Sequence, residues 1–406
     1  MEFKNLHIIL LFVTYFSYVL SLAIRDNVGK VNIQQMEPTE KLQTLINDFK
    51  VAEFRGNDVV DTILKMGGFN NDADLVKFVM NEMGFKNETN VLLKSIGNAC
   101  TTFQIPNENG NGYFVGRNFD WEVGHGLVLV NHPDNGYSSV STVNTDFISW
   151  TFENLSFMEL AVKYIKNKEP VKQIPDELLR VLSLYAPLDG MNEKGLTIAI
   201  NMLPFGNDIH QNNTNYRNLT TLSLVRVLLD KVATVDEAIE FLKETNYHTQ
   251  NNVICHYHIS DPSGKSVVVE FVNGKTVVND ANVITNFYID KEMYNHGHGQ
   301  DRYEIVEKYM AQYSKMNAET VRDTLKAAAH NTLWSIVYDK TNVEATYYFA
   351  SNYEQAYSIK LNTNSDDDSD SDETVNVSDG EVVEEDDSEY DSEYDSSDEK
   401  TENEQN

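Results

Sequence analysis

Residues 99–122 read ACTTFQIPNENGNGYFVGRNFDWE, and this stretch decides the fold. Two largely apolar runs flank the polar turn PNENGNG, in which Gly and Asn allow the positive φ angles that a tight turn needs. The pattern predicts an antiparallel hairpin. Because a hairpin returns the chain to its starting point, we expect Arg117 and Asp120 on the second strand to lie near Cys100 on the first.

Further strands and helices are indicated on both sides of this hairpin. Residues 253–279 read as three strands joined by two turns, and residues 332–350 read as another hairpin. Helical periodicity is found in residues 34–99, where strands are scarce, in residues 155–166 and in residues 219–245, with an N-cap near Thr234. No glycine-rich phosphate loop follows a strand. These blocks favour an α+β architecture over a parallel nucleotide-binding sheet.

Composition and charge exclude several classes of protein. The chain has 406 residues, 41% of them hydrophobic, which is enough for a packed core. Its net charge is −31, and the 20 Asp and Glu of residues 365–406 against the single Lys400 contribute −19 of it. Nucleic acid and acidic lipid surfaces are therefore not expected as partners. We expect the Asp/Glu/Ser-rich tail, residues 363–406, to be disordered.

The N-terminus predicts export from the cytoplasm. Lys4 precedes an uncharged apolar run, and Ala23 is a suitable last residue of a signal peptide covering residues 1–23. The alternative is an uncleaved membrane anchor, because the run is long enough to span a bilayer. We therefore expect a secreted protein, or a lumenal or anchored one. Five glycosylation sequons fit this compartment, at Asn87, Asn154, Asn212, Asn218 and Asn376.

Cys100 becomes a catalytic candidate if the peptide bond before it is cut. The new α-amino group, with a pKa near ~7.7, could act as the base for the thiol of the same residue. Such a site also needs a carboxylate to orient the amine, a cation to favour the thiolate and amide donors for an oxyanion. Asp120 and Arg117 supply the first two. The alternatives are a disulfide to Cys255 and a solvated Arg and Asp on an edge strand.

The hairpin and five later segments, in this order, resemble the choloylglycine hydrolase family of N-terminal-nucleophile hydrolases. This family includes bile salt hydrolases, penicillin V acylases and the related acid ceramidases. The later segments are DGMNEKGLTIAINML (189–203), HYHISDPSGKSVVVEF (256–271), NVITNF (282–287), DRYEIV (301–306) and TLWSIVYDKTN (332–342). The resemblance implies an oxyanion-hole role for Asn201, a hold on the reacting carbonyl for Asn286, and an active-site role for Arg302. It also implies a four-layer αββα sandwich with two stacked antiparallel sheets.

The chain departs from the bacterial bile salt hydrolases before Cys100. Those enzymes have almost nothing before their cysteine, whereas here a pro-segment of residues 24–99, predicted to be helical, precedes an amidase domain of residues 100–362. The arrangement is more similar to that of the acid ceramidases. Residues 122–131, EVGHGLVLVN, are not typical of a ceramidase, so the substrate cannot be transferred from the resemblance.

The other candidate residues are aromatic residues and histidines. Trp121, Phe103 and His125 are candidates for lining a substrate pocket, although aromatic residues are more often core. The two pairs His256/His258 and His296/His298 have no third ligand with metal-site spacing, so we predict structural or surface roles for them and neither a metal nor a cofactor.

The sequence thus predicts a secreted cysteine amidase that hydrolyses a linear, non-peptide C–N bond of a small N-acyl substrate after autoproteolysis before Cys100. Two alternatives stay open: an acyltransferase on the same scaffold, and a catalytically silent secreted interaction protein.

Overall fold

The computed structural model describes residues 43–46, 49–82, 99–121, 124–148, 176–204, 206–250, 252–361 and 378–379. The predicted signal peptide, the helix predicted at residues 155–166 and almost all of the acidic tail lie outside the described residues. Among the described residues, no helix is both long and apolar enough to cross a membrane.

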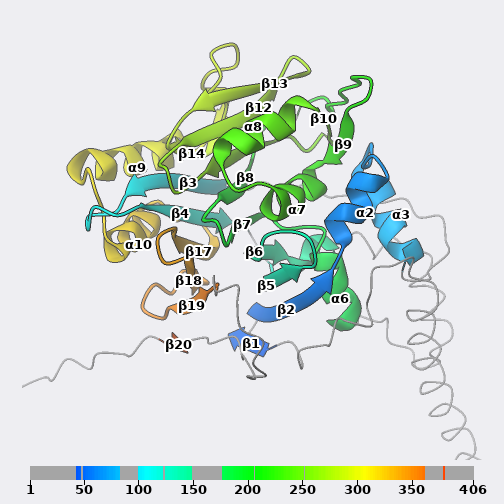
Figure 1. The fold of residues 1–406 in the computed structure, drawn as a ribbon. Coiled ribbons are helices and arrows are strands. Elements are labelled where there is room, and N and C mark those ends of the chain that lie inside the picture. The colour runs from blue at the N-terminus through cyan, green and yellow to red at the C-terminus, as the bar shows by residue number, and fades with distance from the viewer. Residues whose placement is uncertain are drawn as a thin grey trace, which may run out of the picture.

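Two large sheets stack on each other in the described part of the chain (Figure 1). The larger sheet has the order β1 (Gln43–Ile46), β2 (Phe49–Asn57), β5 (Gly126–Pro133), β6 (Ser139–Asn144), β7 (Asp189–Asn192), β8 (Thr197–Met202), β11 (Cys255–Ser260), β12 (Ser266–Val272) and β13 (Lys275–Asp280). The second has the order β14 (Val283–Ile284), β3 (Ala99–Pro106), β4 (Tyr113–Asp120), β17 (Thr332–Asp339), β18 (Glu344–Phe349), β19 (Tyr357–Lys360) and β20 (Ser378–Asp379). Two small sheets pair β9 (Arg217–Thr220) with β10 (Thr245–His248) and β15 (Asn286–Phe287) with β16 (Gly297–His298).

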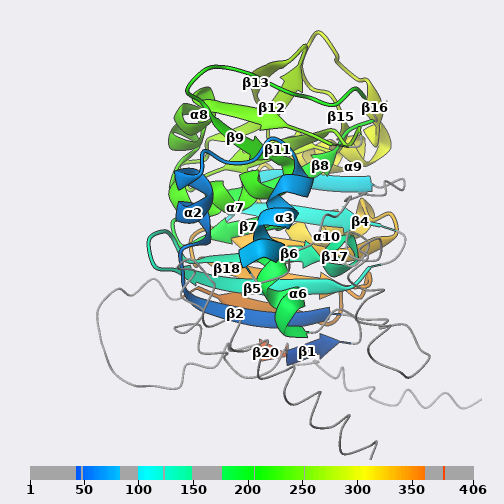
Figure 2. The ribbon, with the colours of Figure 1, turned by 90° about the vertical axis from the view of Figure 1, so that its right-hand side faces the viewer.

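Helices cover the outer face of each sheet. On the larger sheet α7 (Thr221–Lys231) packs on β7 and β8, and α2 (Val59–Lys65) and α3 (Asp72–Glu82) pack on α7. Figure 2 shows these three helices, with α6 (Asp176–Ser183), in front of the strands. On the second sheet lie α9 (Gln300–Gln312) and α10 (Ala318–Ala327), and α8 (Val235–Lys243) packs against β10 and β13. The order helix, sheet, sheet, helix confirms the predicted αββα class.

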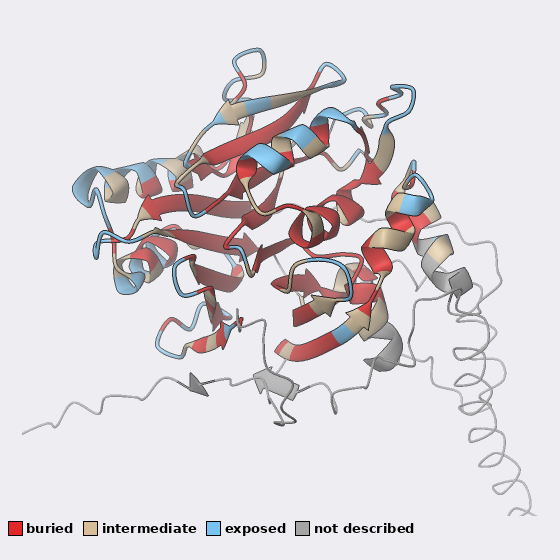
Figure 3. Cartoon of the chain, viewed as in Figure 1, coloured by how far each residue is buried: buried red, intermediate tan, exposed pale blue. Residues whose placement is uncertain are grey.

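The core fills the space between the sheets and the space under the helices. Figure 3 shows the central strands almost wholly buried and the loops and outer helix faces exposed. One large cluster joins the two sheets and α7, and a second cluster, which includes Phe103, Val306 and Leu325, lies between the second sheet and helices α9 and α10. β3 and β4 therefore have core on both faces, which explains why their residues are almost all buried.

The local predictions are confirmed where turn and cap chemistry decides them. The hairpin β3/β4, the three-stranded meander β11/β12/β13 and the hairpin β17/β18 all form. Gly110 and Gly112 adopt positive φ in the first turn, at 83° and 74°. Thr234 caps α8 by accepting a hydrogen bond from the Glu237 amide at 3.2 Å.

The prediction of a mostly helical segment before Cys100 was wrong for residues 43–57. Residues 43–57 form strands β1 and β2, and helices α2 and α3 begin only after them. β2 pairs in parallel with β5, so the larger sheet is not purely antiparallel as predicted. Phe49 of β2 also stacks on Phe349 of β18 in the second sheet, with ring centroids 4.2 Å apart. The short apolar spacing in this region fits a buried strand as well as a helix, and the distant partner β5 decides between them.

Candidate functional site

Cys100 is the second residue of β3 and is held by its own backbone. Its amide donates a hydrogen bond to Asn286 Oδ1 at 2.7 Å, and its carbonyl accepts one from Arg302 Nη1. Arg302 also donates to Asn286 Oδ1 at 2.8 Å through Nη2. The residue is 2% exposed. Three candidates from the sequence are thus brought together, and two of them fix the main chain on either side of the Cys100 Cα.

Arg117 and Asp120, the two charged residues of β4, lie on opposite faces of the sheet. Register pairs Ala99 with Asp120 and Thr102 with Arg117, and side chains alternate between faces along a strand. Cys100 and Arg117 therefore point toward the larger sheet, whereas Asp120 points toward the helix layer. The predicted proximity of Arg117 and Asp120 to Cys100 is confirmed. Arg117 lies on the same face of the sheet as the Cys100 thiol, and Asp120 lies beside the start of β3.

Arg117 is fully buried between the sheets and is saturated with acceptors. It donates to Asp189 Oδ2 at 3.3 Å, to Asn201 Oδ1 at 2.9 Å and to the Ile200 carbonyl at 2.7 Å. Burial lowers the pKa of its guanidinium, but the neighbouring Cys100 and Asp189 outweigh burial and raise that pKa above its ordinary value. A buried cation therefore lies on the thiol side of Cys100.

Asn201 connects this cation to the loop that carries Asn286. Its Oδ1 also accepts from Thr102 Oγ1 at 3.0 Å, and its Nδ2 donates to the Thr285 carbonyl at 3.0 Å. Both the oxygen and the nitrogen of the Asn201 side-chain amide are thus hydrogen-bonded. Nδ2 also lies 3.5 Å from the Ile284 carbonyl, so both of its hydrogens have acceptors. An oxyanion role for Asn201 would require Nδ2 to exchange one of these two bonds for one to the substrate.

Asp120 has one bound and one unbound carboxylate oxygen. Thr332 Oγ1 donates to Oδ1, whereas Oδ2 is buried and makes no hydrogen bond within the described residues. Arg302 Nη1 lies 3.7 Å from Oδ2, too far for a hydrogen bond. Burial raises the pKa of Asp120 to about 7, although Thr332, Arg302 and Arg117 oppose the shift. An acceptor oxygen therefore lies at the strand end where an α-amino group of Cys100 would form.

A glycine fixes the start of the helix that carries Arg302. Gly299 has φ 91°, and a Cβ there would lie 2.2 Å from Arg302 Nη2. Both the backbone conformation and the lack of a side chain are therefore needed for Arg302 to reach Cys100.

A buried hydrogen-bonded pair, His256 and Glu270, lies behind the site and was not predicted from the sequence. His256 Nδ1 lies 3.0 Å from Glu270 Oε1, and His256 Nε2 lies 2.9 Å from the Thr285 carbonyl. Glu270 also accepts from the amides of Ile289 and Asp290. The pair holds the segment on both sides of Asn286 against β11 and β12. The sequence feature that could have predicted this pair is a Glu inside the apolar run SVVVEFV, because a buried Glu needs a polar partner and the preceding strand has a histidine.

Asp189 and Thr332 were also missed. Both lie in segments that resemble the family, but only their contacts show a role: Asp189 binds Arg117, Trp334 and Tyr338, and Thr332 binds Asp120.

The candidate pocket residues are not all near Cys100. Phe103 is fully buried on the opposite face of β3, in the core under α9 and α10, so the structure does not bring it to the site. Trp121 is buried and stacks on Phe119, the cross-strand partner of Cys100, at 5.9 Å. His125 is on the surface, and its Nδ1 lies 2.9 Å from Asp146 Oδ1.

The disulfide alternative and the structural role predicted for the histidines can be compared with the structure. Cys100 and Cys255 are both free and buried, and burial raises the pKa of the Cys255 thiol well above its usual value. His258 is buried, with Nε2 2.9 Å from Ser266 Oγ. Within the described ranges, no three His, Cys, Asp or Glu side chains gather as a metal site.

Comparison with known proteins finds one family model, whose match begins after the Cys100 hairpin. Residues 184–354 match the model of the acyl-coenzyme A:6-aminopenicillanic acid acyl-transferase family. A penicillin V acylase of Pectobacterium atrosepticum is 29% identical over 110 residues, which are 24% of this chain and 29% of that protein's length. The predicted resemblance to the choloylglycine hydrolase family is confirmed. The family match includes Asn201, Asn286 and Arg302, whereas Cys100 and its hairpin precede it.

Two solved structures are similar in backbone. A penicillin V acylase from Agrobacterium tumefaciens has a TM-score of 0.43 at 18% identity, covering 64% of this chain and 86% of that one. A mutant of the conjugated bile acid hydrolase from Clostridium perfringens has a TM-score of 0.47 at 18% identity, covering 66% of this chain and 93% of that one.

Proposed function

We propose that the chain is a cysteine amidase of the N-terminal-nucleophile type, which hydrolyses the linear C–N bond of a small N-acyl amide. The observation that carries the proposal is the surroundings of Cys100: a buried guanidinium on its thiol side, a bound main chain, and an unbound carboxylate oxygen at the end of its strand. Each of these groups matches one requirement of a cysteine that uses its own amine as the base.

The proposed activation is cleavage before Cys100. Sγ attacks the Ala99 carbonyl carbon, the C–N bond between the residues breaks, and the nitrogen takes up a proton. Water then hydrolyses the thioester, which frees the thiol and leaves an α-amino group on Cys100. Asp120 Oδ2 accepts a hydrogen bond from this amine and orients it toward Sγ.

The proposed turnover follows the same chemistry on the substrate. The amine takes the thiol proton while Sγ attacks the amide carbonyl, and it then gives the proton to the leaving nitrogen. Water hydrolyses the acyl-thioester and releases the acid. Asn286 is the better placed oxyanion donor, because its Nδ2 is bound to the Met202 carbonyl at 2.7 Å and an amide group has two hydrogens. Asn201 fixes Arg117, and Arg302 fixes the Cys100 carbonyl.

The test is the N-terminus and mass of the purified protein before and after thiol alkylation. We expect a chain that begins at Cys100, and loss of cleavage and of amidase activity in Cys100→Ala. Cys255→Ala is the matched control, because Cys255 is the other free, buried cysteine and lies in β11. An active protein with an unbroken Ala99–Cys100 bond, or with a disulfide between the two cysteines, would overturn the proposal.

An acyltransferase is the second candidate, because the family model that matches is that of an acyl-transferase. In that reaction an amine takes the place of water at the thioester. Turnover of an N-acyl amide in the presence of primary amines separates the two: transferred acyl product indicates the transferase, and free acid alone indicates the hydrolase. We also propose that the protein is secreted, which detection of the mature chain outside producing cells would test.

A further inference from the structure

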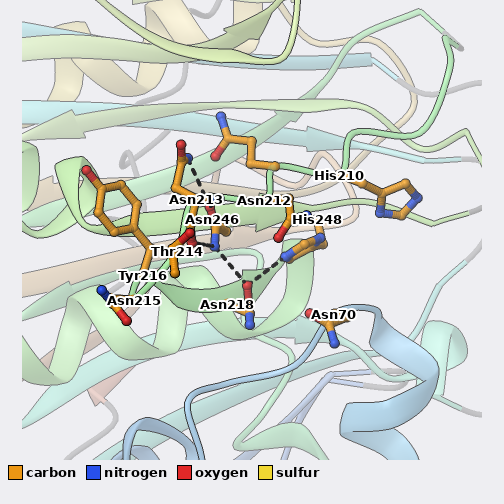
Figure 4. A pocket seen from close by; sticks show the side chains of 11 residues that line it. Asn70, His210, Asn212, Asn213, Thr214, Asn215, Tyr216, Asn218, Asn246 and His248 are labelled. Atoms are coloured by element: carbon orange, nitrogen blue, oxygen red, sulfur yellow. Dashed lines mark hydrogen bonds between the residues drawn. The ribbon is translucent and has the colours of Figure 1, made fainter.

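A cavity of about 570 Å³ lies on the small sheet formed by β9 and β10 (Figure 4). Its volume falls within the range of about 300–1,000 Å³ that is typical of small-molecule sites. It is formed by the loop before β9, by both strands and by the turn between α2 and α3, and it contains none of the residues around Cys100. The residues that line it are Asn70, His210, Gln211, Asn212, Asn213, Thr214, Asn215, Tyr216, Asn218, Asn246 and His248.

None of the described residues that line the cavity is an Asp, Glu, Lys or Arg. This is unusual for a chain in which 23% of the residues are charged. Phosphate, carboxylate and ammonium groups would find no opposite charge in the lining. The amides, hydroxyls and imidazoles that line the cavity both donate and accept hydrogen bonds, so they suit a neutral ligand with many polar groups.

His248 shows which polar group the ligand needs. The side chain is 5% exposed, and its Nε2 lies 3.0 Å from Asn218 Oδ1. That oxygen also accepts from Asn246 Nδ2 at 3.1 Å, so the proton of the imidazole is on Nε2. Nδ1 is then an acceptor, and it is buried without a hydrogen-bond partner among the described residues. Burial lowers the pKa of His248, which keeps the ring neutral. A ligand hydroxyl is the donor that matches this nitrogen.

The site is also held in shape and has an aromatic edge. The Asn213 backbone amide and Nδ2 both donate to Asn246 Oδ1, at 2.8 and 3.0 Å, and Asn246 Nδ2 donates to the Asn213 carbonyl at 3.0 Å. Tyr216 is 39% exposed and offers an aromatic surface beside the amides (Figure 4). Fixed amides beside an exposed ring can bind the hydroxyls and the C–H face of one ligand together.

We propose that this cavity is a binding site for a neutral saccharide, separate from the site around Cys100 and independent of the proposed amidase activity. The sugar hydroxyls exchange hydrogen bonds with the asparagines, one hydroxyl donates to His248 Nδ1, and Tyr216 packs against the ring of the sugar.

The experiment is a ligand titration monitored by NMR. It uses full-length protein produced without N-glycans, because Asn212 and Asn218 are both sequon asparagines in the lining. The probes are glucose, mannose and N-acetylglucosamine, with inorganic phosphate as the charged probe. We expect saturable binding of at least one sugar and no binding of phosphate. Tyr216→Ala and His248→Phe should each weaken binding at least about tenfold. Tyr294→Ala is the matched control, since Tyr294 is 68% exposed and outside the lining.

Three results would overturn the proposal: no sugar binds up to about 50 mM, phosphate binds more tightly than every sugar, or Tyr216→Ala binds like the wild type. Tyr216→Ala decides the matter if His248→Phe fails to fold, because Tyr216 is on the surface. Its amidase activity should equal that of the wild type, which separates this site from the one at Cys100.

Discussion

The buried carboxyl of Asp120 should make the uncleaved protein less stable at alkaline pH. Burial raises the pKa of Asp120 from 3.8 to about 7, so the folded chain keeps a proton that the unfolded chain has lost. The stabilisation is complete below pH 3.8 and is lost as the pH rises through 7. Between pH 5 and pH 8 the proton is lost from the folded chain over roughly two pH units, which lowers the unfolding free energy by about 2–3 kcal/mol.

The assay is urea denaturation of Cys100→Ala, which lacks the nucleophile of the proposed cleavage, at pH 5, 6.5 and 8. Its unfolding free energy should fall by about 2–3 kcal/mol more over this range than that of Cys100→Ala/Asp120→Asn. The pKa values of Asp72 and Asp230 are also raised by burial, to about 6, but both variants contain these residues and their effects cancel.

Asp280→Asn in the same background is the control, because Asp280 is an exposed residue of β13. Equal pH dependence in Cys100→Ala with and without Asp120 would refute the reasoning. If cleavage places an ammonium group next to Oδ2, the cleaved wild type should show a smaller pH effect than Cys100→Ala.

Three further predictions concern the frame of the site. Asp189→Asn removes the charge that pairs with buried Arg117 and should lower the unfolding free energy by about 3–5 kcal/mol in denaturant melts; a loss no larger than that of Asp280→Asn would contradict the pairing. Glu270→Gln should lower kcat about tenfold or more with little change in KM, because the loop of Asn286 loses its anchor while the substrate pocket does not; a change confined to KM would speak against a positioning role. Phe103→Ala should cost about 3–5 kcal/mol of stability and leave KM unchanged, since the side chain is core, and a raised KM would return Phe103 to the substrate pocket.

Sequence reasoning reached the parts of the molecule that short-range chemistry decides. The hairpin around Cys100 follows from its glycine-rich turn, and the cap at Thr234 follows from a four-residue pattern. The proximity of Arg117 and Asp120 follows from the hairpin, and their opposite faces could have been read from strand alternation as well.

Contacts between segments far apart in the sequence could not be predicted from short-range patterns. The bond from Arg117 to Asn201 joins residues 84 apart, and the resemblance to a family indicated Asn201 without indicating that its amide is used by Arg117 and Thr285. β2 was misread because its partner β5 follows the Cys100 hairpin. The contact between His256 and Glu270 could be predicted only from the register of β11 against β12, which places two polar side chains together inside an apolar sheet.

The position of β2 means that a cut before Cys100 would not separate the molecule into a domain and a released leader. β2 is hydrogen-bonded along β5 from Phe49 to Asn57, and Phe49 reaches across to Phe349. The Phe49 ring packs against Gly126, where a Cβ would lie 2.4 Å from the ring, so only glycine leaves room for it. The two products would be two chains of one folding unit. They would form an obligate heterodimer encoded by one gene. Each chain expressed alone would expose a sheet edge, and activity would return only when both are folded together.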